Sequence, residues 1–127
     1  METVAQITIA PVVGPEFLAG STRLKSGTAQ KMVLNMITTG AMIEIGKTYG
    51  NLMVDVQATN DKLKVRAARI ISLITGASAE RASETLVQAG GSAKVATVMV
   101  QLGCTADEAR PILDQSGGYL RKALQGR

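Results

Sequence analysis

The segment from Thr28 to Ile45 most strongly restricts what this chain can fold into. Hydrophobic residues fall on nearly every face of the helix that it predicts, and such a helix is enclosed by other elements or by a partner subunit. These residues are Met32, Val33, Leu34, Met36, Ile37, Ala41, Met42, Ile43 and Ile45. The segment is shorter than the roughly 20 apolar residues of a membrane span, and polar residues interrupt it. We therefore expect a buried helix that stops at Gly46.

A strand is expected before this helix. Val4–Val13 is rich in β-branched residues, and Pro11 followed by Gly14–Pro15 ends it. Both of its faces are apolar, which favours a strand buried in an α/β layer. Because one strand cannot form a sheet, either it pairs with another chain or the sequence is part of something longer. We favour the second alternative.

After a turn at Tyr49–Asn51, the rest of the chain predicts helices. The first runs from Thr59 or Asn60 to Gly76, and its basic residues indicate a solvated face, with a ligand or membrane surface as the alternative. Three more start at Ser78, Ser92 and the capping box of Thr105, and a short last helix points Leu120, Ala123 and Leu124 inward. Pro111 fits the third of these poorly, so either a kink or a later helix start is needed. A boundary near Gly76 would separate a small helical bundle.

Composition excludes several classes of function. The chain has no histidine, which removes Ser/His and Cys/His nucleophilic mechanisms and nearly every common zinc site. Its single cysteine, Cys104, fits a reducing cytoplasm and is best interpreted as a small, half-buried hydrophobic residue. No signal peptide is visible, so we expect a cytoplasmic protein. The net charge is +4, the basic residues are scattered and only three residues are aromatic, so we expect no binding to nucleic acid. Because the apolar segment is too short to span a membrane, we expect no membrane partner either.

The segment Gly20–Lys31 has the composition of an anion site. It combines glycines, hydroxyl groups and three cations directly before the apolar helix. A helix start offers unpaired N–H groups and the positive end of the macrodipole, and glycines allow a ligand to approach the backbone. A phosphate or carboxylate site is one interpretation, and a polar loop before an ordinary helix is the other. The glycine spacing differs from that of a Walker loop.

Two motifs resemble those of a known family. Residues 13–31 read VGPEFLAGSTRLKSGTAQK and residues 49–60 read YGNLMVDVQATN. Both closely resemble the N-acetylmuramic acid 6-phosphate etherases, and the glucokinase regulatory proteins carry a version of the first motif. The resemblance continues through Lys62–Leu63 and Arg66–Ala67 into the helical bundle, and so covers essentially the whole chain.

The resemblance implies a mostly α fold. Residues 1–58 would be the last strand, motif loop and helix of an α/β sugar-isomerase-type (SIS) domain whose parallel sheet lies mostly upstream of the chain. Residues 59–76 would be a connecting helix, and residues 77–127 a ubiquitin-associated-like (UBA-like) three-helix bundle.

The resemblance also implies a function. The family cleaves the D-lactyl ether of its phosphosugar in peptidoglycan recycling, with glutamates as acid and base and with no metal or organic cofactor. Those glutamates lie in the upstream part of the family sequence, so we assign no catalytic residue here; the glutamates that cannot take that role are Glu16, Glu44, Glu80, Glu84 and Glu108. The expected function is closure of the substrate pocket and oligomerisation, as a homodimer or a higher oligomer. The alternatives are a non-catalytic phosphosugar-sensing or protein-interaction module and a purely structural helical domain.

By motif position, the resemblance implies a set of substrate-binding residues. They are Glu16, Ser21, Thr22, Arg23, Lys25, Gly27 and Thr28. Within this set, we expect Ser21, Arg23 and Lys25 to close the sugar-phosphate pocket, and Glu16 to orient the loop or to contact the sugar.

Overall fold

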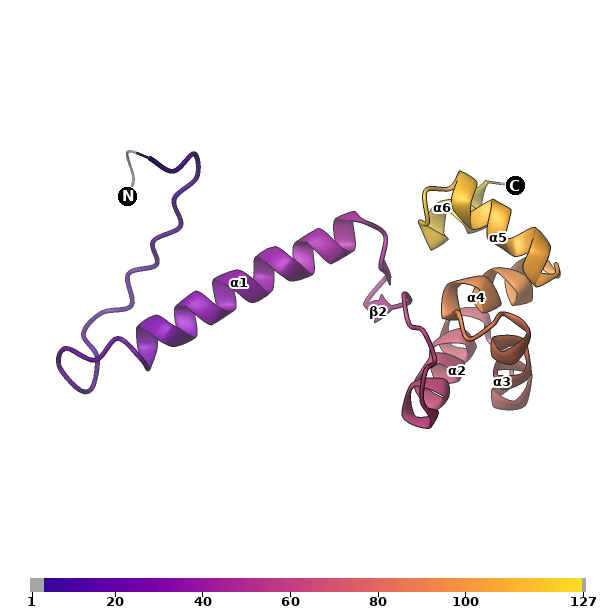
Figure 1. Cartoon of the computed structure of the whole chain (residues 1–127), viewed down its shortest axis with the longest axis horizontal. Coiled ribbons are helices and arrows are strands. Elements are labelled where there is room, and N and C mark those ends of the chain that lie inside the picture. The colour runs from indigo at the N-terminus through magenta and orange to yellow at the C-terminus, as the bar shows by residue number, and fades with distance from the viewer. Residues whose placement is uncertain (1–3, 127) are drawn as a thin grey trace. The chain divides into compact units, whose positions relative to one another are not determined.

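The computed structural model describes residues 4–126 and is mostly helical, as predicted (Figure 1). Its elements in chain order are α1 (Lys25–Glu44), β1 (Thr48–Tyr49), β2 (Leu52–Met53), α2 (Asp61–Thr75), α3 (Ala79–Gln88), α4 (Ala93–Leu102), α5 (Ala106–Gln115) and α6 (Leu120–Gln125). The chain divides into two compact units between Ala41 and Met42.

The strand expected over Val4–Val13 does not form in this structure. Residues 4–24 contain neither helix nor strand, and they approach the start of α1 as an irregular chain (Figure 1). The first unit contains no described strand with which this segment could form a ladder of hydrogen bonds, and a strand without a partner is not stable. Its apolar side chains are accordingly open to solvent: Ile9 is 56% exposed and Val12 is 98% exposed.

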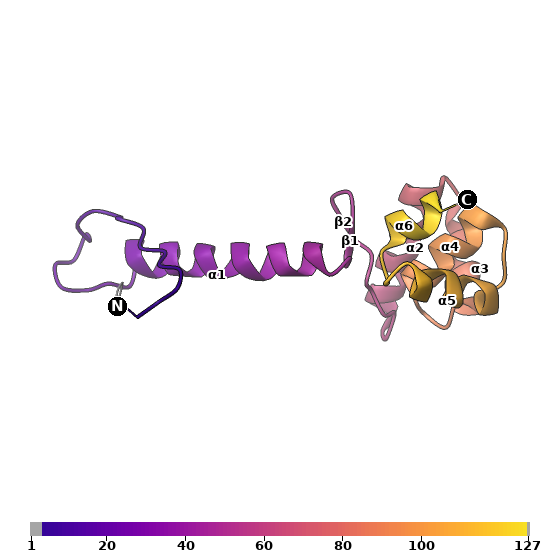
Figure 2. The ribbon, with the colours of Figure 1, turned by 90° about the horizontal axis from the view of Figure 1, so that it is seen from above.

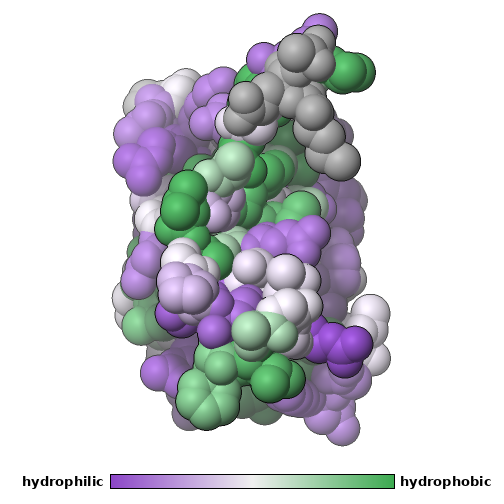
Figure 3. All heavy atoms as spheres, turned by 90° about the vertical axis from the view of Figure 1, so that its left-hand side faces the viewer, coloured by the Kyte–Doolittle hydropathy of each residue, from purple (hydrophilic) through white to green (hydrophobic). Residues whose placement is uncertain are grey.

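Helix α1 begins at Lys25, earlier than the expected Thr28, and no described residue in it is buried. Large apolar side chains therefore lie on its surface, among them Met32, Leu34, Met36 and Ile37. The space-filling view of the side that carries the N-terminal segment shows hydrophobic residues open at the surface of this part of the chain (Figure 3). The enclosure that the sequence predicts for this helix is not supplied by the described part of the chain.

The stop predicted at Gly46 is confirmed. Gly46 has a left-handed φ of 73°, its N–H bonds the Ile43 carbonyl at 3.0 Å, and the Lys47 N–H bonds the Met42 carbonyl at 3.1 Å. This pair of hydrogen bonds is a Schellman motif, which requires a positive φ that glycine adopts without strain. The hairpin that follows pairs Tyr49 with Leu52 around Gly50, so the turn predicted at Tyr49–Asn51 is confirmed as well.

Helix α4 is the centre of the second unit. It packs against α2, α3, α5 and α6, which surround it (Figure 2). Six of its ten residues are buried: Ala93, Val95, Ala96, Thr97, Val98 and Met99. Because α2 also packs against α3 and α4, the boundary placed near Gly76 from the sequence lies inside this unit. The exposed basic residues of α2 face solvent, as expected.

The helix starts of the second unit follow the capping signals in the sequence. The side chains of Asn60, Ser78, Ser92 and Thr105 each accept a hydrogen bond from the backbone N–H three residues further on. At Thr105 the Glu108 carboxylate also accepts from the Thr105 N–H at 2.8 Å, which completes the predicted capping box. Leu120 and Ala123 of α6 are buried and Leu124 is half-buried, also as predicted.

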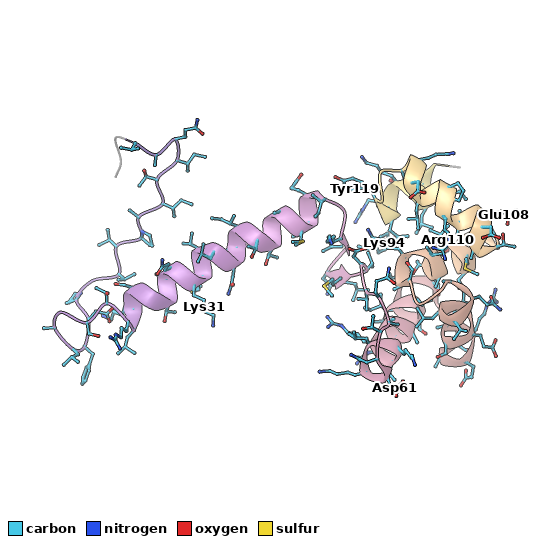
Figure 4. The ribbon with its side chains drawn as sticks, in the orientation of Figure 1. Lys31, Asp61, Lys94, Glu108, Arg110 and Tyr119 are labelled. Carbon is cyan, nitrogen blue, oxygen red and sulfur yellow. The ribbon has the colours of Figure 1, made fainter. Side chains whose placement is uncertain are left out.

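Polar contacts fasten α6 and the hairpin to the rest of this unit. Tyr119 donates its hydroxyl to the Glu44 carbonyl, and the Lys122 ammonium lies 4.3 Å from the centre of the Tyr119 ring. Lys94, whose side chain is 13% exposed, donates to the Gly118 carbonyl at 2.8 Å and lies 3.5 Å from Asp55 (Figure 4). A hydrogen bond from Lys47 to Asp55 at 2.8 Å is the largest cause that holds the pKa of Asp55 below its ordinary value.

Pro111 lies inside α5, which begins at Ala106, so the later helix start considered for it is wrong. The proline ring removes the N–H that would bond the Asp107 carbonyl one turn earlier. Both residues are exposed, so water can reach that carbonyl. The helix therefore tolerates a residue that would be far more costly in a buried interior.

We expect Pro111→Ala to stabilise the second unit. The substitution restores the missing helical hydrogen bond and removes the steric conflict of the ring, so the free energy of unfolding rises by about 1–2 kcal/mol. Urea unfolding followed by circular dichroism at 222 nm measures the change. Gln115→Ala, an exposed position in the last turn of the same helix, is the control and leaves the midpoint within about 0.5 kcal/mol. A midpoint that falls on Pro111→Ala contradicts the prediction.

Candidate functional site

The candidate site lies at the start of α1, in the first unit. Residues 14–24 approach the helix through turns in which Gly14 and Gly20 have φ values of 71° and 82°. The Ser21 N–H bonds the Leu18 carbonyl at 3.1 Å, and the Thr28 N–H bonds the Leu24 carbonyl at 3.0 Å, which begins the helical ladder. The loop thus places the cationic residues of the motif next to the first turn of the helix.

The helix start is bound by a carboxylate of the chain itself. The Glu16 Oε2 accepts from the Lys25 N–H at 3.0 Å, and Oε1 accepts from the Ser26 N–H at 3.0 Å. These two backbone hydrogen bonds, that of Lys25 first, hold the pKa of the Glu16 carboxyl below its ordinary value, because they favour its charged form. The anion that occupies this helix start in the structure is the carboxylate of Glu16 itself.

The two cations of the loop, Arg23 and Lys25, differ in their hydrogen bonding. Lys25 donates its Nζ to the Pro15 carbonyl at 2.9 Å, so this ammonium group is used in holding the loop. No hydrogen bond or ion pair engages the Arg23 guanidinium within residues 4–126. Lys31, the third cation of the segment, lies further along α1 (Figure 4).

A shallow depression of about 580 Å³ opens beside these residues. Its lining is Val13, Arg23, Leu24, Lys25, Thr28, Ala29 and Met32. Of the substrate-binding residues expected from the sequence, Arg23, Lys25 and Thr28 therefore share one surface. Ser21, Thr22 and Gly27 are outside this lining, and Glu16 contacts the helix start instead. A side chain at Gly27 would meet the Thr22 carbonyl at an ordinary 3.8 Å, so packing alone does not require glycine there.

Sequence reasoning missed the partners that shape this loop. The acceptors and donors are backbone groups of Pro15, Lys25 and Ser26, and apolar lining comes from Val13 and Met32. A capping box spans four residues, whereas Glu16 caps a helix nine residues away in the chain. The sequence analysis named Glu16 as a residue that orients the loop or contacts the sugar, but the Lys25 and Ser26 N–H groups to which it bonds were not foreseen.

No group of three or more metal-ligating side chains comes together in residues 4–126. Within the same residues, no helix is both long enough and apolar enough to cross a membrane. In the second unit, a groove of about 340 Å³ lies between α2 and α3, and its apolar lining includes Ala58, Val65, Leu86 and Val87.

The chain is similar to known proteins in both units. Residues 50–94 match the family model of the C-terminal lid domain of glucokinase regulatory protein. An N-acetylmuramic acid 6-phosphate etherase of Brucella anthropi is 57% identical over 96% of this chain and 40% of its own length. Relatives of that name from Alkaliphilus metalliredigens and Escherichia coli (strain SMS-3-5 / SECEC) are 55% and 54% identical. They are matched over 96% and 98% of this chain, and over 40% and 42% of their own lengths.

The chain therefore spans about 40% of the length of these curated relatives. The match includes both motifs whose resemblance to the etherases was noted in the sequence, because it covers nearly all of the chain.

Proposed function

We propose that this chain, which is homologous to the C-terminal part of the N-acetylmuramic acid 6-phosphate etherases, supplies one wall of a phosphosugar-binding site. The observation that carries the proposal is the Arg23 guanidinium, which lines the depression at the start of α1 together with Thr28 and has no partner in the described chain. A guanidinium beside a hydroxyl group suits a phosphate monoester, because it offers a fork of charged donors.

The residues of this wall bind and orient rather than react. Arg23 would hold the phosphate, Thr28 would donate a hydrogen bond to it, and Ser21 and Thr22 would line the loop that closes over the sugar. Glu16, the acidic residue of the motif, is already bonded to two backbone N–H groups, and those bonds favour its ionised form over a proton donor. We therefore assign pocket closure to this chain and no acid–base step.

Oligomerisation is the second part of the proposed function. Helix α1 carries apolar side chains that are 46–62% exposed at positions including Met36 and Met42. Contiguous apolar surface of this kind on a helix is typical of an interface. We propose that α1 packs against other SIS-domain elements or a second protomer, and that the protein is a cytoplasmic homodimer or higher oligomer. We also propose that residues 77–127 form a UBA-like bundle, into which α2 leads and against whose helices α3 and α4 it packs.

The binding test uses calorimetry with N-acetylmuramic acid 6-phosphate and the 127-residue chain. We expect Arg23→Ala to weaken binding by about tenfold or more, because it removes the charged donors to the phosphate. Lys25→Ala is expected to weaken binding as well, because it removes the hydrogen bond from the Lys25 ammonium to the Pro15 carbonyl that helps to hold the loop. Arg69→Ala, an exposed arginine on α2, is the matched control and leaves the affinity unchanged. Unchanged affinity in both loop variants contradicts the proposed site.

An activity measurement tests whether this chain by itself has etherase activity. The chain by itself is expected to release no lactate from the phosphosugar above background. Lactate release in proportion to the amount of protein would contradict the assignment of pocket closure without catalysis.

The groove between α2 and α3 favours a second candidate, a non-catalytic module that senses a phosphosugar or binds a protein. Val65 and Val87 of its lining are 71% and 79% exposed, and exposed apolar side chains around a groove are typical of interaction surfaces. For a protein-binding module, calorimetry would detect no phosphosugar binding, whereas a sensor would bind it with the Arg23 dependence described above.

A further inference from the structure

We infer that Glu16 is a positioning residue. Its carboxylate accepts hydrogen bonds from the N–H groups at the start of α1, and the loop held in this way binds an anion through the Arg23 side chain. The inference rests on the proposed phosphosugar site and divides the roles among its residues. It assigns Glu16 and Lys25 to holding the loop, and Arg23 to holding the ligand.

Three hydrogen bonds close the loop upon the helix. Both oxygens of the Glu16 carboxylate are used, one by the Lys25 N–H and one by the Ser26 N–H, each at 3.0 Å. The Lys25 ammonium returns to the Pro15 carbonyl at 2.9 Å. These bonds join Pro15 and Glu16 at one end of the loop to Lys25 and Ser26 at the other, so residues 15–26 form a closed ring. The two hydrogen bonds to its carboxylate also restrict rotation of the Glu16 side chain.

Arg23 lies inside this ring, two residues before the bonded Lys25. Its side chain is exposed, and no ion pair or side-chain hydrogen bond within residues 4–126 orients it. The position of its backbone is therefore set by the closed loop. A guanidinium that must meet a phosphate gains affinity when its backbone is held in place before the ligand arrives.

The carboxylate also changes what the helix start can bind. A helix N-terminus attracts anions through its unpaired N–H groups and the positive end of the macrodipole. Here Glu16 satisfies two of these groups and supplies the complementary negative charge. A phosphate that reached the same two N–H groups would have to displace it. Of the two cations of the loop, Lys25 is bonded to the Pro15 carbonyl, and Arg23 is the one that remains for a ligand. Arg23 lines the depression.

Two other roles for Glu16 give different expectations. If Glu16 contacted the sugar directly, its loss would weaken binding independently of Arg23. If the ligand phosphate displaced Glu16 from the helix start, removing the charge would make binding tighter. A positioning role predicts weaker binding that depends on the presence of Arg23.

The experiment compares the wild-type chain with Glu16→Gln, Arg23→Ala and the double variant. Glu84→Gln, an exposed glutamate of α3, is the matched control. Calorimetry with N-acetylmuramic acid 6-phosphate gives the affinities, and NMR hydrogen exchange follows the Lys25 and Ser26 amides. We expect Glu16→Gln to weaken binding about tenfold and to speed exchange of both amides by a similar factor, as loss of a helix cap does. In the Arg23→Ala background, we expect Glu16→Gln to weaken binding no further.

Each outcome decides one of the two proposals. If the wild-type chain binds and Glu16→Gln binds equally well or more tightly, the positioning role is wrong while the proposed site stands. A further loss of affinity in the double variant also overturns the positioning role, because it indicates a direct contact. If the wild-type chain does not bind, the proposed function fails. The amide exchange then decides the inference: unchanged exchange in Glu16→Gln overturns the ring, and faster exchange supports it.

Discussion

Gly46→Ala is expected to lower the free energy of unfolding of the second unit by about 2–4 kcal/mol, through left-handed strain and a steric clash together. Gly46 has a φ of 73°, which an alanine adopts only with strain. A Cβ at this position would also lie 2.9 Å from Cδ1 of the Tyr119 ring and 3.0 Å from its Cγ. Something must move to relieve contacts that short.

The Tyr119 ring has little freedom to move away. Its hydroxyl donates to the Glu44 carbonyl, and the Lys122 ammonium covers the ring at 4.3 Å from its centre. Relief of the clash would therefore break the contact between α6 and the end of α1.

Gly76→Ala is the matched control for this prediction. Gly76 ends α2 with a φ of 74°, and a Cβ there would have no neighbour within 4 Å. The control carries the backbone strain without the clash, and we expect it to cost about 1 kcal/mol. Urea unfolding of both variants, followed by circular dichroism and by the near-ultraviolet signal of the tyrosines, measures the difference. Equal losses in the two variants would show that Tyr119 does not pack on Gly46.

Ile71→Ala is expected to destabilise the second unit by about 3 kcal/mol, within the range for a large aliphatic residue replaced by alanine in a core. Ile71 is fully buried in α2, among the largest side chains of the core. The substitution removes apolar area from the contact of α2 with α3 and α4 and leaves a cavity, since the backbone helices cannot collapse completely into the space.

Leu73→Ala tests whether burial causes this effect. Leu73 lies two residues further along the same helix and is 61% exposed, so we expect its replacement to cost less than about 1 kcal/mol. Thermal and urea unfolding of both variants give the comparison. A cost for Leu73→Ala that matches that of Ile71→Ala would contradict the packing of α2 onto the bundle and would indicate that the exposed face is covered in solution.

The helix ends were predictable because their signals are local. Asn60, Ser78, Ser92 and Thr105 each satisfy N–H groups within one turn, so the sequence around each cap contains both partners. The left-handed stops at glycine are local in the same way. Cys104, expected to be a half-buried hydrophobic residue, is half-buried and packs against the core. Expectations of this kind need no knowledge of the tertiary fold.

The strand expected over Val4–Val13 does not form in the described structure, and the later start of α5, one of two alternatives considered for Pro111, is wrong. The strand over Val4–Val13 has suitable side chains, but a strand forms only when a neighbouring strand accepts its hydrogen bonds. The later start of α5 was considered because a proline inside a helix is costly, yet Asp107 and Pro111 are both exposed, and hydration at an exposed position reduces that cost. In both cases solvent and neighbours decided the outcome.

The sequence by itself determined the mostly helical character of this protein, the capped helix starts of the second unit and the etherase resemblance of its two motifs, because periodicity, caps and motif residues are properties of adjacent positions. Only the tertiary structure decided that Glu16 caps α1, that Tyr119 packs on Gly46 and that α4 is the centre of the bundle. Each of these depends on a contact between residues far apart in the chain, and such contacts follow from packing rather than from local preference.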